Sequence, residues 1–383
     1  MKGNITRRGK TSWRIKFDVE SGPKGRETRY VTVRGTKKDA QIEAAKIIAA
    51  TSKGEYVEAS KETIAQFIER WLRDWAAGNT SNKTYTRYEQ LLRLHVAAHV
   101  GTKPIQRLRA THLQALYATL QRPAPAGSGL AARTVLHVHR AVHRMLRHAA
   151  QWGTVYQNAA ALVDAPSVPD TEIEILTTAQ VQAVLLTLRA SNGTPRHVYT
   201  IATVALGTGM RRGELLALRW QDVELDAAML RVERSLEQTK RGGLVFKAPK
   251  TRHGRRSVTL PASTVAELRT HWRTVQERRL SLGAGKSPED DLVFGNLDGT
   301  PYTPNALTKA WSLAMSNAKI VATLHSLRHT HASTLIASGL DVLTISRRLG
   351  HGSPAITLKV YGHLFKTDDR AAHIMEAAFA GVE

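Results

Sequence analysis

Cysteine is absent from this chain of 383 residues. Its absence excludes disulfide bonds, zinc sites built on thiolates and thiol nucleophiles, and it fits a reducing compartment. Long apolar runs are absent as well, since no stretch of about 18 apolar residues is present to form a transmembrane helix. The N-terminal sequence MKGNITRR also lacks the apolar core of a signal peptide. The sequence therefore predicts a cytoplasmic protein without a membrane anchor.

Acidic side chains are scarce relative to basic ones. The chain has 55 lysines and arginines against 32 aspartates and glutamates, a formal net charge of +23. This excess favours a polyanionic partner, either nucleic acid or an anionic membrane surface. Nucleic acid is the better candidate because no membrane span or signal peptide is predicted. The hydrophobic content of 42% is sufficient for globular cores, and the length indicates two or three domains.

The first segment, residues 1–55, has the pattern of a small β-rich module. Trp13, Ile15 and Phe17 alternate with charged residues, which is the period of a half-buried strand. We expect a turn, a second strand and an alanine-rich helix after it, at residues 21–25, 30–33 and 37–50. The segment carries 14 basic and 6 acidic side chains, a net charge of +8. A short basic sheet can lie in a DNA groove, although a merely solvated surface has the same composition.

The second segment, residues 59–165, is predicted to be all-helical. Apolar residues at helical spacing indicate four helices, at residues 63–75, 84–99, 111–120 and 131–152. The last helix is rich in basic and histidine side chains: Arg133, His137, His139, Arg140, His143, Arg144, Arg147 and His148. These side chains either contact phosphates or form a solvated face. A proline-containing linker at residues 165–171 and a capping box at Thr177–Gln180 then open the third segment.

The most informative residues lie in this third segment. His325 and Arg328 are three positions apart, His351 follows a glycine, and Tyr361 comes ten positions later. Far upstream, Arg211 lies in the sequence TGMRRGEL. Two arginines, two histidines and a tyrosine, with no paired carboxylates nearby, suit covalent attack on a phosphodiester without a metal ion.

The order and spacing of these residues resemble the tyrosine recombinase (phage integrase) family. Its motifs are a T-G-x-R-x-x-E-L box, a lysine on a β-hairpin, H-x-x-R, G-H and Y, and this chain has all of them in order. The resemblance covers nearly the whole chain, although the motifs lie in its C-terminal half. It implies neither cofactor nor metal, and the following site residues: Arg211, Lys250, His325, Arg328, His351 and the nucleophile Tyr361, with Glu214 in a supporting role.

The arginine box has a clear physical rationale. A phosphodiester repels a nucleophile until its charge is neutralised, and the planar fork of arginine binds two oxygens and stays charged. Arg211 stands at the predicted start of a helix through residues 215–218, where free N–H groups add positive potential. The family box selects Arg211 over the adjacent Arg212. Glu214 lies one helical turn on, so we expect it to orient Arg211 through a buried salt bridge rather than act as a general base.

The lysine motif is predicted to lie on a hairpin. Residues 244–246 form one strand, residues 257–260 form the return strand, and Lys250 lies in the connection. A lysine on a mobile hairpin can protonate the departing 5′ oxygen as a general acid. Lys247 is a competitor, but the pair Lys250-Thr251 better resembles the family motif.

His325 and Arg328 share one helix face because they are three residues apart. We expect Arg328 to complete the phosphate clamp, and His325 to transfer a proton or bond a phosphate oxygen. The nearby His329 and His331 raise a metal site as an alternative. A suitable carboxylate and metal-binding spacing are missing, so this alternative is the weaker one.

The nucleophile is predicted to end a short helix. Asp341 can cap one helix that Gly350 ends, which holds His351 at a turn. Ser353-Pro354 then begins the helix that carries Tyr361 on its last turn. A tyrosine has an ordinary pKa near 10, so we expect the two guanidiniums and the lysine to favour phenolate character in the attack.

An apparent nucleotide-binding motif is a false match. The tripeptide Gly285-Lys286-Ser287 ends like a P-loop, but position 280 is Leu280 instead of the required glycine. The segment also follows a helical pattern at residues 265–282 where the motif needs a strand. The sequence therefore predicts no ATP binding.

The fold class expected from these patterns is a multidomain α+β protein. Its expected parts are a small β-sheet-plus-helix module that binds arm-type DNA (1–55), an all-helical, SAM-like core-binding domain (59–165) and a mainly α catalytic domain with a small antiparallel sheet (172–383). The resemblance implies a site-specific integrase of a phage or other mobile element. It further implies core and arm attachment sites on double-stranded DNA, and a homotetramer in which the tail at residues 371–380 docks on a neighbour.

The resemblance also bears on further partners and on alternative functions. A DNA-bending host factor and an excisionase are possible partners, and association with the nucleoid of a prokaryotic host is expected. A dimer resolvase or a type IB topoisomerase would share the chemistry, but neither requires the module at residues 1–55. A non-catalytic DNA-binding regulator would need basic surfaces without the complete set of site residues.

Overall fold

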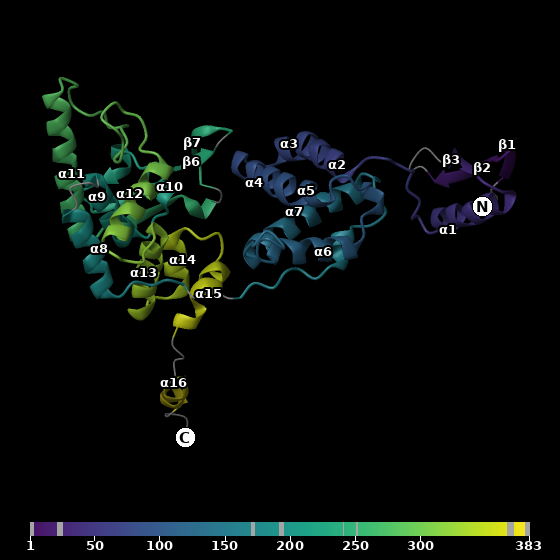
Figure 1. The fold of residues 1–383 in the computed structure, drawn as a ribbon. Helices are drawn as coiled ribbons and strands as arrows, with labels where there is room; N and C mark the ends of the chain where they lie inside the picture. Colours follow the sequence, from purple (N-terminus) through teal and green to yellow (C-terminus); the bar gives the residue numbers. More distant parts are fainter. Residues whose placement is uncertain are drawn as a thin grey trace. The chain divides into compact units, whose positions relative to one another are not determined.

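The computed structural model describes residues 4–20, 26–169, 173–190, 195–239, 241–249, 252–365 and 371–379. The chain divides into two compact units, Met1–Pro169 and Asp170–Glu383. Its elements are drawn in Figure 1. The turn predicted at residues 21–25 and the predicted site residue Lys250 lie outside the described residues. Among the described residues, none of the helices combines the length and apolar content that a bilayer-crossing segment requires.

The N-terminal module is an antiparallel sheet of three strands with a helix on one face (Figure 1). The elements are β1 (Asn4–Gly9), β2 (Ser12–Glu20), β3 (Arg26–Arg34) and α1 (Lys37–Ser52). Ile15 and Phe17 of β2 are buried against Ala44 and Ile47 of α1, so the period-2 pattern places alternate residues inside. The strand β1 was not predicted, because its polar sequence NITRRG carries no apolar alternation.

The rest of the first unit is all-helical, as predicted. Its helices are α2 (Ile64–Trp71), α3 (Ala77–Asn79), α4 (Asn82–Leu92), α5 (Ala98–Val100), α6 (Ala110–Gln121) and α7 (Ala132–Gln151). A π-helical turn at Leu72–Ala76 joins α2 to α3, and another at Arg93–Ala97 joins α4 to α5. These helices enclose a core of their own around Trp71.

The basic face predicted for α7 is only partly correct. The arginines of this helix are exposed: Arg133, Arg140, Arg144 and Arg147. His139 and His148, in contrast, are 8% and 6% exposed. The Nδ1 atom of His148 accepts a hydrogen bond of 2.7 Å from the indole N–H of Trp71. These two histidines therefore belong to the helical core and not to a DNA-facing surface.

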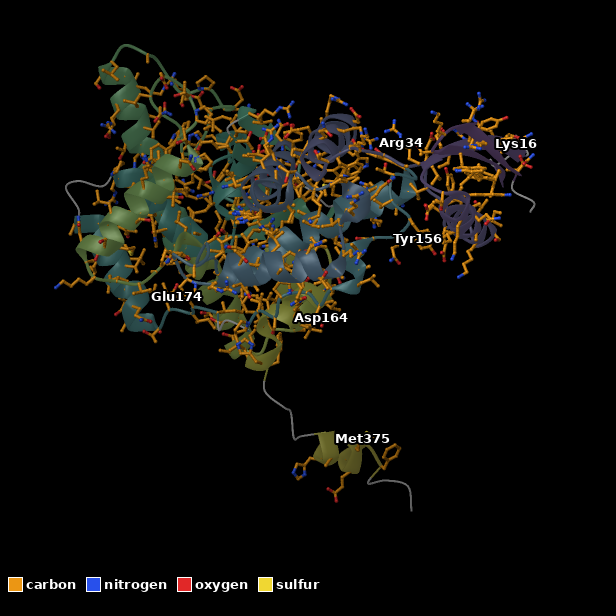
Figure 2. All side chains as sticks on the ribbon, turned by 45° about the vertical axis from the view of Figure 1, so that its right-hand side comes forward. Lys16, Arg34, Tyr156, Asp164, Glu174 and Met375 are labelled. Atoms are coloured by element: carbon orange, nitrogen blue, oxygen red, sulfur yellow. The ribbon has the colours of Figure 1, made fainter. Side chains whose placement is uncertain are left out.

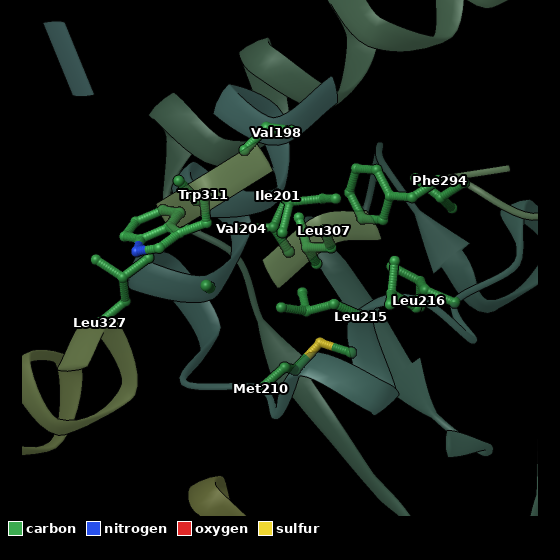
Figure 3. Close-up of a cluster of buried hydrophobic side chains, with 14 of the residues drawn as sticks. Val198, Ile201, Val204, Met210, Leu215, Leu216, Phe294, Leu307, Trp311 and Leu327 are labelled. Carbon is green, nitrogen blue, oxygen red and sulfur yellow. The ribbon is translucent and has the colours of Figure 1, made fainter. Parts of the chain in front are cut away.

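The second unit is mainly helical. Its helices are α8 (Thr178–Ala190), α9 (Arg196–Thr208), α10 (Arg212–Leu215), α11 (Ala262–Ser281), α12 (Pro304–Asn317), α13 (Leu324–Ala337), α14 (Val342–Leu349), α15 (Pro354–Tyr361) and α16 (Ala371–Phe379). Each unit also contains short 3-10 turns. Those of the first unit lie at Ile105–Arg107 and Ala159–Leu162, and those of the second unit lie at Trp220–Asp222, Arg252–Gly254 and Gly362–Leu364. Ile201 of α9 is fully buried among Leu307, Trp311 and Phe294, as Figure 3 shows.

Two small antiparallel sheets replace the predicted hairpin. One sheet has the order β4 (Val223–Glu224), β5 (Met229–Val232), β8 (Arg256–Thr259), and the other pairs β6 (Ser235–Thr239) with β7 (Gly243–Lys247). The prediction that residues 244–246 pair with residues 257–260 is therefore wrong. Val258 of β8 is opposite Leu230 of β5 and both are buried, whereas β7 is largely exposed. Burial of an apolar pair thus selects a partner that lies farther away in the sequence.

Candidate active site

Three of the predicted site residues, Arg211, Arg328 and His351, lie at the C-terminal end of α14. Asp341 caps the start of this helix, accepting hydrogen bonds of 2.9 Å from the backbone N–H groups of Leu343 and Thr344. Gly350 ends it in the left-handed conformation, with φ of 66°. A Cβ atom at Gly350 would lie 2.7 Å from Nη1 of Arg256, so both the backbone angle and the close approach favour glycine. The predicted cap and terminus are confirmed.

Arg328 is the most deeply buried arginine of the predicted clamp, with 2% exposure. Its Nη1 donates to the carbonyl oxygen of Gly209 at 2.6 Å, and its Nη2 donates to that of Leu349 at 2.8 Å. Burial, with the charge of Arg211, lowers the pKa of Arg328 to about 9. The side chain is therefore still a cation at neutral pH, held by two backbone oxygens from different helix ends.

Arg211 lies beside Arg328 but is only partly buried. Its side chain is 41% exposed, its Nη1 donates to Oε1 of Glu214 at 2.8 Å, and its Nη2 donates to the carbonyl oxygen of Gly350 at 3.3 Å. The adjacent Arg212 points elsewhere and donates to the carbonyl oxygen of Pro304 at 3.3 Å. The geometry therefore favours Arg211 over Arg212 as the phosphate ligand.

The helix at the arginine box is shorter than expected. α10 ends at Leu215, although we expected the helix to include residues 216–218. Arg211 is its N-cap, and the backbone N–H of Arg211 donates to Oε2 of Glu214 at 3.0 Å. The carboxylate thus binds both the backbone and the side chain of one arginine, which agrees with the orienting role expected for Glu214.

Arg256 is a site residue that the sequence did not reveal. Its Nη2 donates to Oε2 of Glu214 at 2.9 Å, and its Nε donates to the carbonyl oxygen of Arg348 at 2.7 Å. Burial by itself raises the pKa of Glu214, but the charge and hydrogen bond of Arg256 and the charge of Arg211 outweigh it, so the pKa is lowered. The only signal in the sequence was a basic residue at the start of a strand, which is too common to be informative.

The three histidines of α13 near the clamp make different contacts. His325 is exposed and its ring contacts that of His329 edge to face, with 4.5 Å between centroids. His329 is hydrogen-bonded through Nδ1 to the hydroxyl of Tyr361 at 2.7 Å. Nδ1 of His331 lies 2.6 Å from the carbonyl oxygen of Leu206, and its Nε2 accepts from Nε of Arg348 at 3.1 Å. Both nitrogens of His331 are thus occupied, which argues against the metal alternative.

No metal cluster is formed within the described ranges. There, no group of three or more histidine, aspartate and glutamate side chains is arranged to hold a metal ion. Burial lowers the pKa of His331 to about 4, and a neutral imidazole fits a ring that donates to a carbonyl and accepts from a guanidinium. His331 therefore links α13 to α9 through Leu206 and to α14 through Arg348.

His351 is held at the end of α14 as predicted. It is 9% exposed, and its Nδ1 is 2.8 Å from the hydroxyl of Thr357 on α15. Burial, followed by the charges of Arg328 and Arg211, lowers the pKa of His351 to about 4. The imidazole is therefore neutral at pH 7 and can donate or accept one hydrogen bond without adding charge to the site.

Tyr361 ends α15, in agreement with its predicted place, but its environment differs from expectation. It is 1% exposed and packs in a small core with Ile336, Ile345 and Leu349. Burial raises the pKa of Tyr361 to about 12, and the charges of Arg328 and Arg211 offset this only in part. In this conformation the cost of burying the charged form therefore exceeds the attraction of the guanidiniums, and the phenolate character expected during the attack stays a prediction.

The lysine motif is only partly visible. Lys250 lies outside the described residues, between β7 and β8. Its competitor Lys247 is ion-paired with Glu237 across the β6–β7 pair, which occupies its ammonium group. Nothing in the described residues therefore favours Lys247 over Lys250.

Comparison with known proteins identifies relatives over most of the chain. Residues 174–368 match the model of the phage integrase family, and residues 63–121 match the N-terminal SAM-like domain of phage integrases. An integrase of Streptomyces ambofaciens is 29% identical over 340 residues, which cover 85% of this chain and 82% of the relative. A tyrosine recombinase XerC-like protein of Caldanaerobacter subterraneus subsp. tengcongensis is 24% identical over 381 residues, 95% of each chain.

Solved structures share the fold. The Tn1549 transposon integrase in complex with a circular intermediate DNA has a TM-score of 0.66 and 20% identity, over 83% of this chain and 99% of that one. A lambda integrase tetramer bound to a Holliday junction has a TM-score of 0.59 and 14% identity, over 96% and 97%. The expected multidomain α+β fold is thereby confirmed. Since the family model matches half of the chain, this protein belongs to the phage integrase family and is a tyrosine-type site-specific recombinase.

Proposed function

We propose that this integrase cuts and rejoins DNA at its attachment sites through Tyr361. The hydroxyl oxygen of Tyr361 attacks the scissile phosphorus, a P–O bond forms to the tyrosine, and the bond to the 5′ oxygen breaks. The phenolic proton leaves, and the departing 5′ oxygen takes up a proton to become a hydroxyl. The product is a 3′-phosphotyrosyl link, which the 5′ hydroxyl of a partner strand reverses. One phosphoester replaces another, so neither ATP nor metal is needed.

The observation that carries this proposal is the arrangement of two arginines around one helix end. Arg211 and Arg328 donate to the carbonyl oxygens of Gly350 and Leu349, which are consecutive in the chain. The two guanidiniums are thereby fixed next to one another before any DNA binds. Such preorganised cations stabilise the extra charge of a pentavalent phosphate without reorganisation during the reaction.

The remaining roles follow from the chemistry of each group. Lys250 is the general acid for the 5′ oxygen. His325 is exposed and can donate a hydrogen bond to a phosphate oxygen or transfer a proton. The neutral His351 donates a hydrogen bond to the phosphate. Glu214 orients Arg211.

Attack by Tyr361 requires a rearrangement. The side chain is 1% exposed, its hydroxyl is bonded to His329, and its pKa is raised to about 12. A DNA phosphate that brings the tyrosine out of this core removes the burial that raises the pKa, while the charges of Arg211 and Arg328 continue to lower it. We therefore assign activation of the tyrosine to the DNA-bound state.

The parts of the chain receive separate tasks in this proposal. Residues 172–383 catalyse, residues 59–165 bind the core site, and residues 1–55 bind arm-type sites on double-stranded DNA. The exposed arginines of α7 and the basic outer face of the N-terminal sheet support the two binding tasks. The relatives and the DNA-bound integrases of similar fold support a bacterial cytoplasmic enzyme that works on the nucleoid.

The assembly on DNA is proposed to be a homotetramer. Exchange of both strands needs four tyrosines, and the lambda integrase of similar fold was solved as a tetramer on a Holliday junction. α16 has an exposed apolar surface that includes Met375 and Phe379, which suits docking on a neighbouring copy. A DNA-bending host factor and an excisionase complete the set of expected partners.

A nicked suicide substrate tests the chemistry. Wild-type protein should accumulate a covalent protein–DNA adduct, because the short strand diffuses away and prevents rejoining. Tyr361→Phe should bind the same DNA and form no adduct. Tyr302→Phe is the matched control, since Tyr302 lies in the same unit and packs against the ring of His197. An adduct formed by Tyr361→Phe at the wild-type rate would disprove the assignment.

A further inference from the structure

The buried side chain of Arg256 has no part in the mechanism proposed above. It is 6% exposed, and all three nitrogens of its guanidinium donate hydrogen bonds within the protein. Nε donates to the carbonyl oxygen of Arg348 at 2.7 Å, Nη1 to that of Gly254 at 3.1 Å, and Nη2 to Oε2 of Glu214 at 2.9 Å. A lysine could not make these three bonds in different directions from one plane.

Arg256 completes a series at the end of α14. The carbonyl oxygens of residues 348, 349 and 350 accept hydrogen bonds from Arg256, Arg328 and Arg211, one arginine each. The C-terminal end of a helix carries partial negative charge, so it can hold several cations that would otherwise repel one another. Arg256 is therefore a third member of the arginine cluster formed with Arg211 and Arg328, and all three of its guanidinium nitrogens donate to protein groups.

Arg256 also joins two parts of the site that are far apart in sequence. Through Glu214 it reaches the carboxylate that binds Arg211. Its Nη1 also donates to the carbonyl oxygen of Gly254, which follows the sequence segment that contains Lys250. A Cβ atom at Gly254 would lie 2.3 Å from Cβ of Pro249, so the two ends of this segment approach each other closely where Arg256 binds.

We propose that Arg256 is a positioning residue for recombination, which fixes Glu214 against Arg211 and links Gly254, four positions after Lys250 in the sequence, to the end of α14. The inference rests on the clamp and general-acid roles proposed above for Arg211 and Lys250. Loss of this one guanidinium should then affect both the cation that binds the phosphate and the cation proposed to protonate the leaving oxygen.

The charges around Glu214 support this role. Four groups face it: Arg211 at the start of α10, Arg256 on β8, Arg328 on α13 and His351 after α14. Burial raises the pKa of Glu214, and Arg256 is the strongest influence that lowers it. Without Arg256 the carboxylate is protonated at a higher pH, and a neutral carboxyl holds Arg211 less firmly.

Cleavage of a nicked core-site substrate by the full chain tests the proposal. Arg256→Met should cleave about 100-fold more slowly than wild type at similar DNA affinity, as is typical when a reacting group is misplaced by about 1 Å. Arg256→Lys keeps the charge without the planar fork, so its rate should lie between the two. Arg255→Met is the matched control, because the neighbouring Arg255 is 62% exposed and pairs with Glu233. Its rate should equal that of wild type.

Two further readouts separate positioning from a purely structural role. The rate of Arg256→Met should fall on acidification at a higher pH than the rate of wild type, because Glu214 takes up a proton earlier. A substrate with sulfur in place of the bridging 5′ oxygen needs no general acid, so it should restore part of the rate of Arg256→Met. A uniformly slower rate, with neither a shifted pH profile nor recovery on the sulfur substrate, would overturn the proposal.

A double variant guards against misfolding. Arg256→Met leaves Glu214 buried without its partner, which can destabilise the chain. Combining it with Glu214→Gln removes both charges and should restore the melting temperature but not the rate. Wild-type cleavage by this folded double variant would refute the proposal. Failure of the general mechanism is recognised separately, because it requires an adduct from Tyr361→Phe.

Discussion

Two regions of this molecule rely on basic side chains, and they hold them in opposite ways. At the end of α14, Arg328 and Arg256 are buried and donate hydrogen bonds to carbonyl oxygens, and Arg256 also donates to Glu214. On the outer face of the N-terminal sheet, Lys16 and Arg34 are exposed, and both are labelled in Figure 2. The same kind of charge is therefore fixed in one region and solvated in the other.

The difference follows from what each region must recognise. A single phosphate in a reaction needs cations whose positions are set in advance, because reorganisation during the reaction slows it. A DNA backbone presents many phosphates, so exposed cations gain affinity from counterion release without fixed geometry. Substitutions should therefore affect rate in the first region and salt-dependent affinity in the second.

The largest effect is expected in the buried cluster. Arg211→Ala and Arg328→Ala should each lower the cleavage rate by about 100- to 1,000-fold, since each removes a preorganised donor to the transition state. DNA affinity should change little. Arg212→Ala is the control, because Arg212 bonds to Pro304 on α12 instead of the clamp. Single-turnover cleavage with saturating enzyme measures the rates.

The distinction between fixed and solvated cations fails if Arg212→Ala is as slow as Arg211→Ala at equal affinity. Such a result would mean that the arginine box raises the cleavage rate through its total positive charge and not through the position of one guanidinium. Preorganisation at the end of α14 would then be irrelevant to the rate.

A second effect is expected on binding when residues 1–55 are deleted. The segment carries a net charge of +8, and Arg14 on its sheet lies over the ring of Tyr30 at 5.5 Å. Deletion should abolish binding to arm sequences and make total binding less dependent on salt, by roughly one unit of slope for each phosphate that is no longer bound. Cleavage of a short core-site substrate should persist. Footprinting of full-length and truncated protein on one attachment site measures the difference.

Identical footprints would contradict the arm-binding assignment. The resolvase and topoisomerase alternatives, which do not need this module, would then gain support. Substituting Lys16 and Arg34 together by alanine, in the full chain, distinguishes removal of the basic face from removal of the folded module.

A smaller effect is expected on stability at acidic pH. Burial lowers the pKa of His331 to about 4, below the ordinary value of 6.5, so the folded state keeps this ring neutral while the unfolded state binds a proton. The unfolding free energy should therefore fall as pH decreases from about 6.5 to about 4, by at most about 1.4 kcal/mol per pH unit for this group. His331→Gln should reduce the pH dependence of the melting temperature in this window. An unchanged dependence would place the titration elsewhere.

Local signals in the sequence predicted most helix ends correctly. Asp341, Ser353 and the pair Thr177 and Gln180 cap helices as expected, because a cap depends only on residues within one turn. The helix start at Arg211 and the turn before His351 also lie where the motifs predicted them, while the roles of these residues in the reaction stay predictions.

Contacts between distant parts of the chain were not predictable from the sequence. The pairing of β5 with β8 depends on the burial of Leu230 and Val258 together, which no local pattern encodes. Arg256 likewise acquires its importance from Glu214, 42 positions away. The raised pKa of Tyr361 depends on a core assembled from three helices, so the expected phenolate was inferred from the nearby charges without the opposing cost of burial.

The smallest expected effect is that of a chelator. His329 is hydrogen-bonded to Tyr361, and His331 is hydrogen-bonded to Leu206 and Arg348. Three of the four ring nitrogens of these histidines therefore already have a hydrogen-bond partner in place of a metal ion. The positive charge that a metal would supply is already provided by Arg211 and Arg328. Adduct formation on the nicked substrate should therefore proceed at an unchanged rate in excess EDTA. If EDTA abolished it and one divalent ion restored it, the histidines would have to leave these partners to bind that ion, and the fixed arginine cluster would no longer account for charge neutralisation alone.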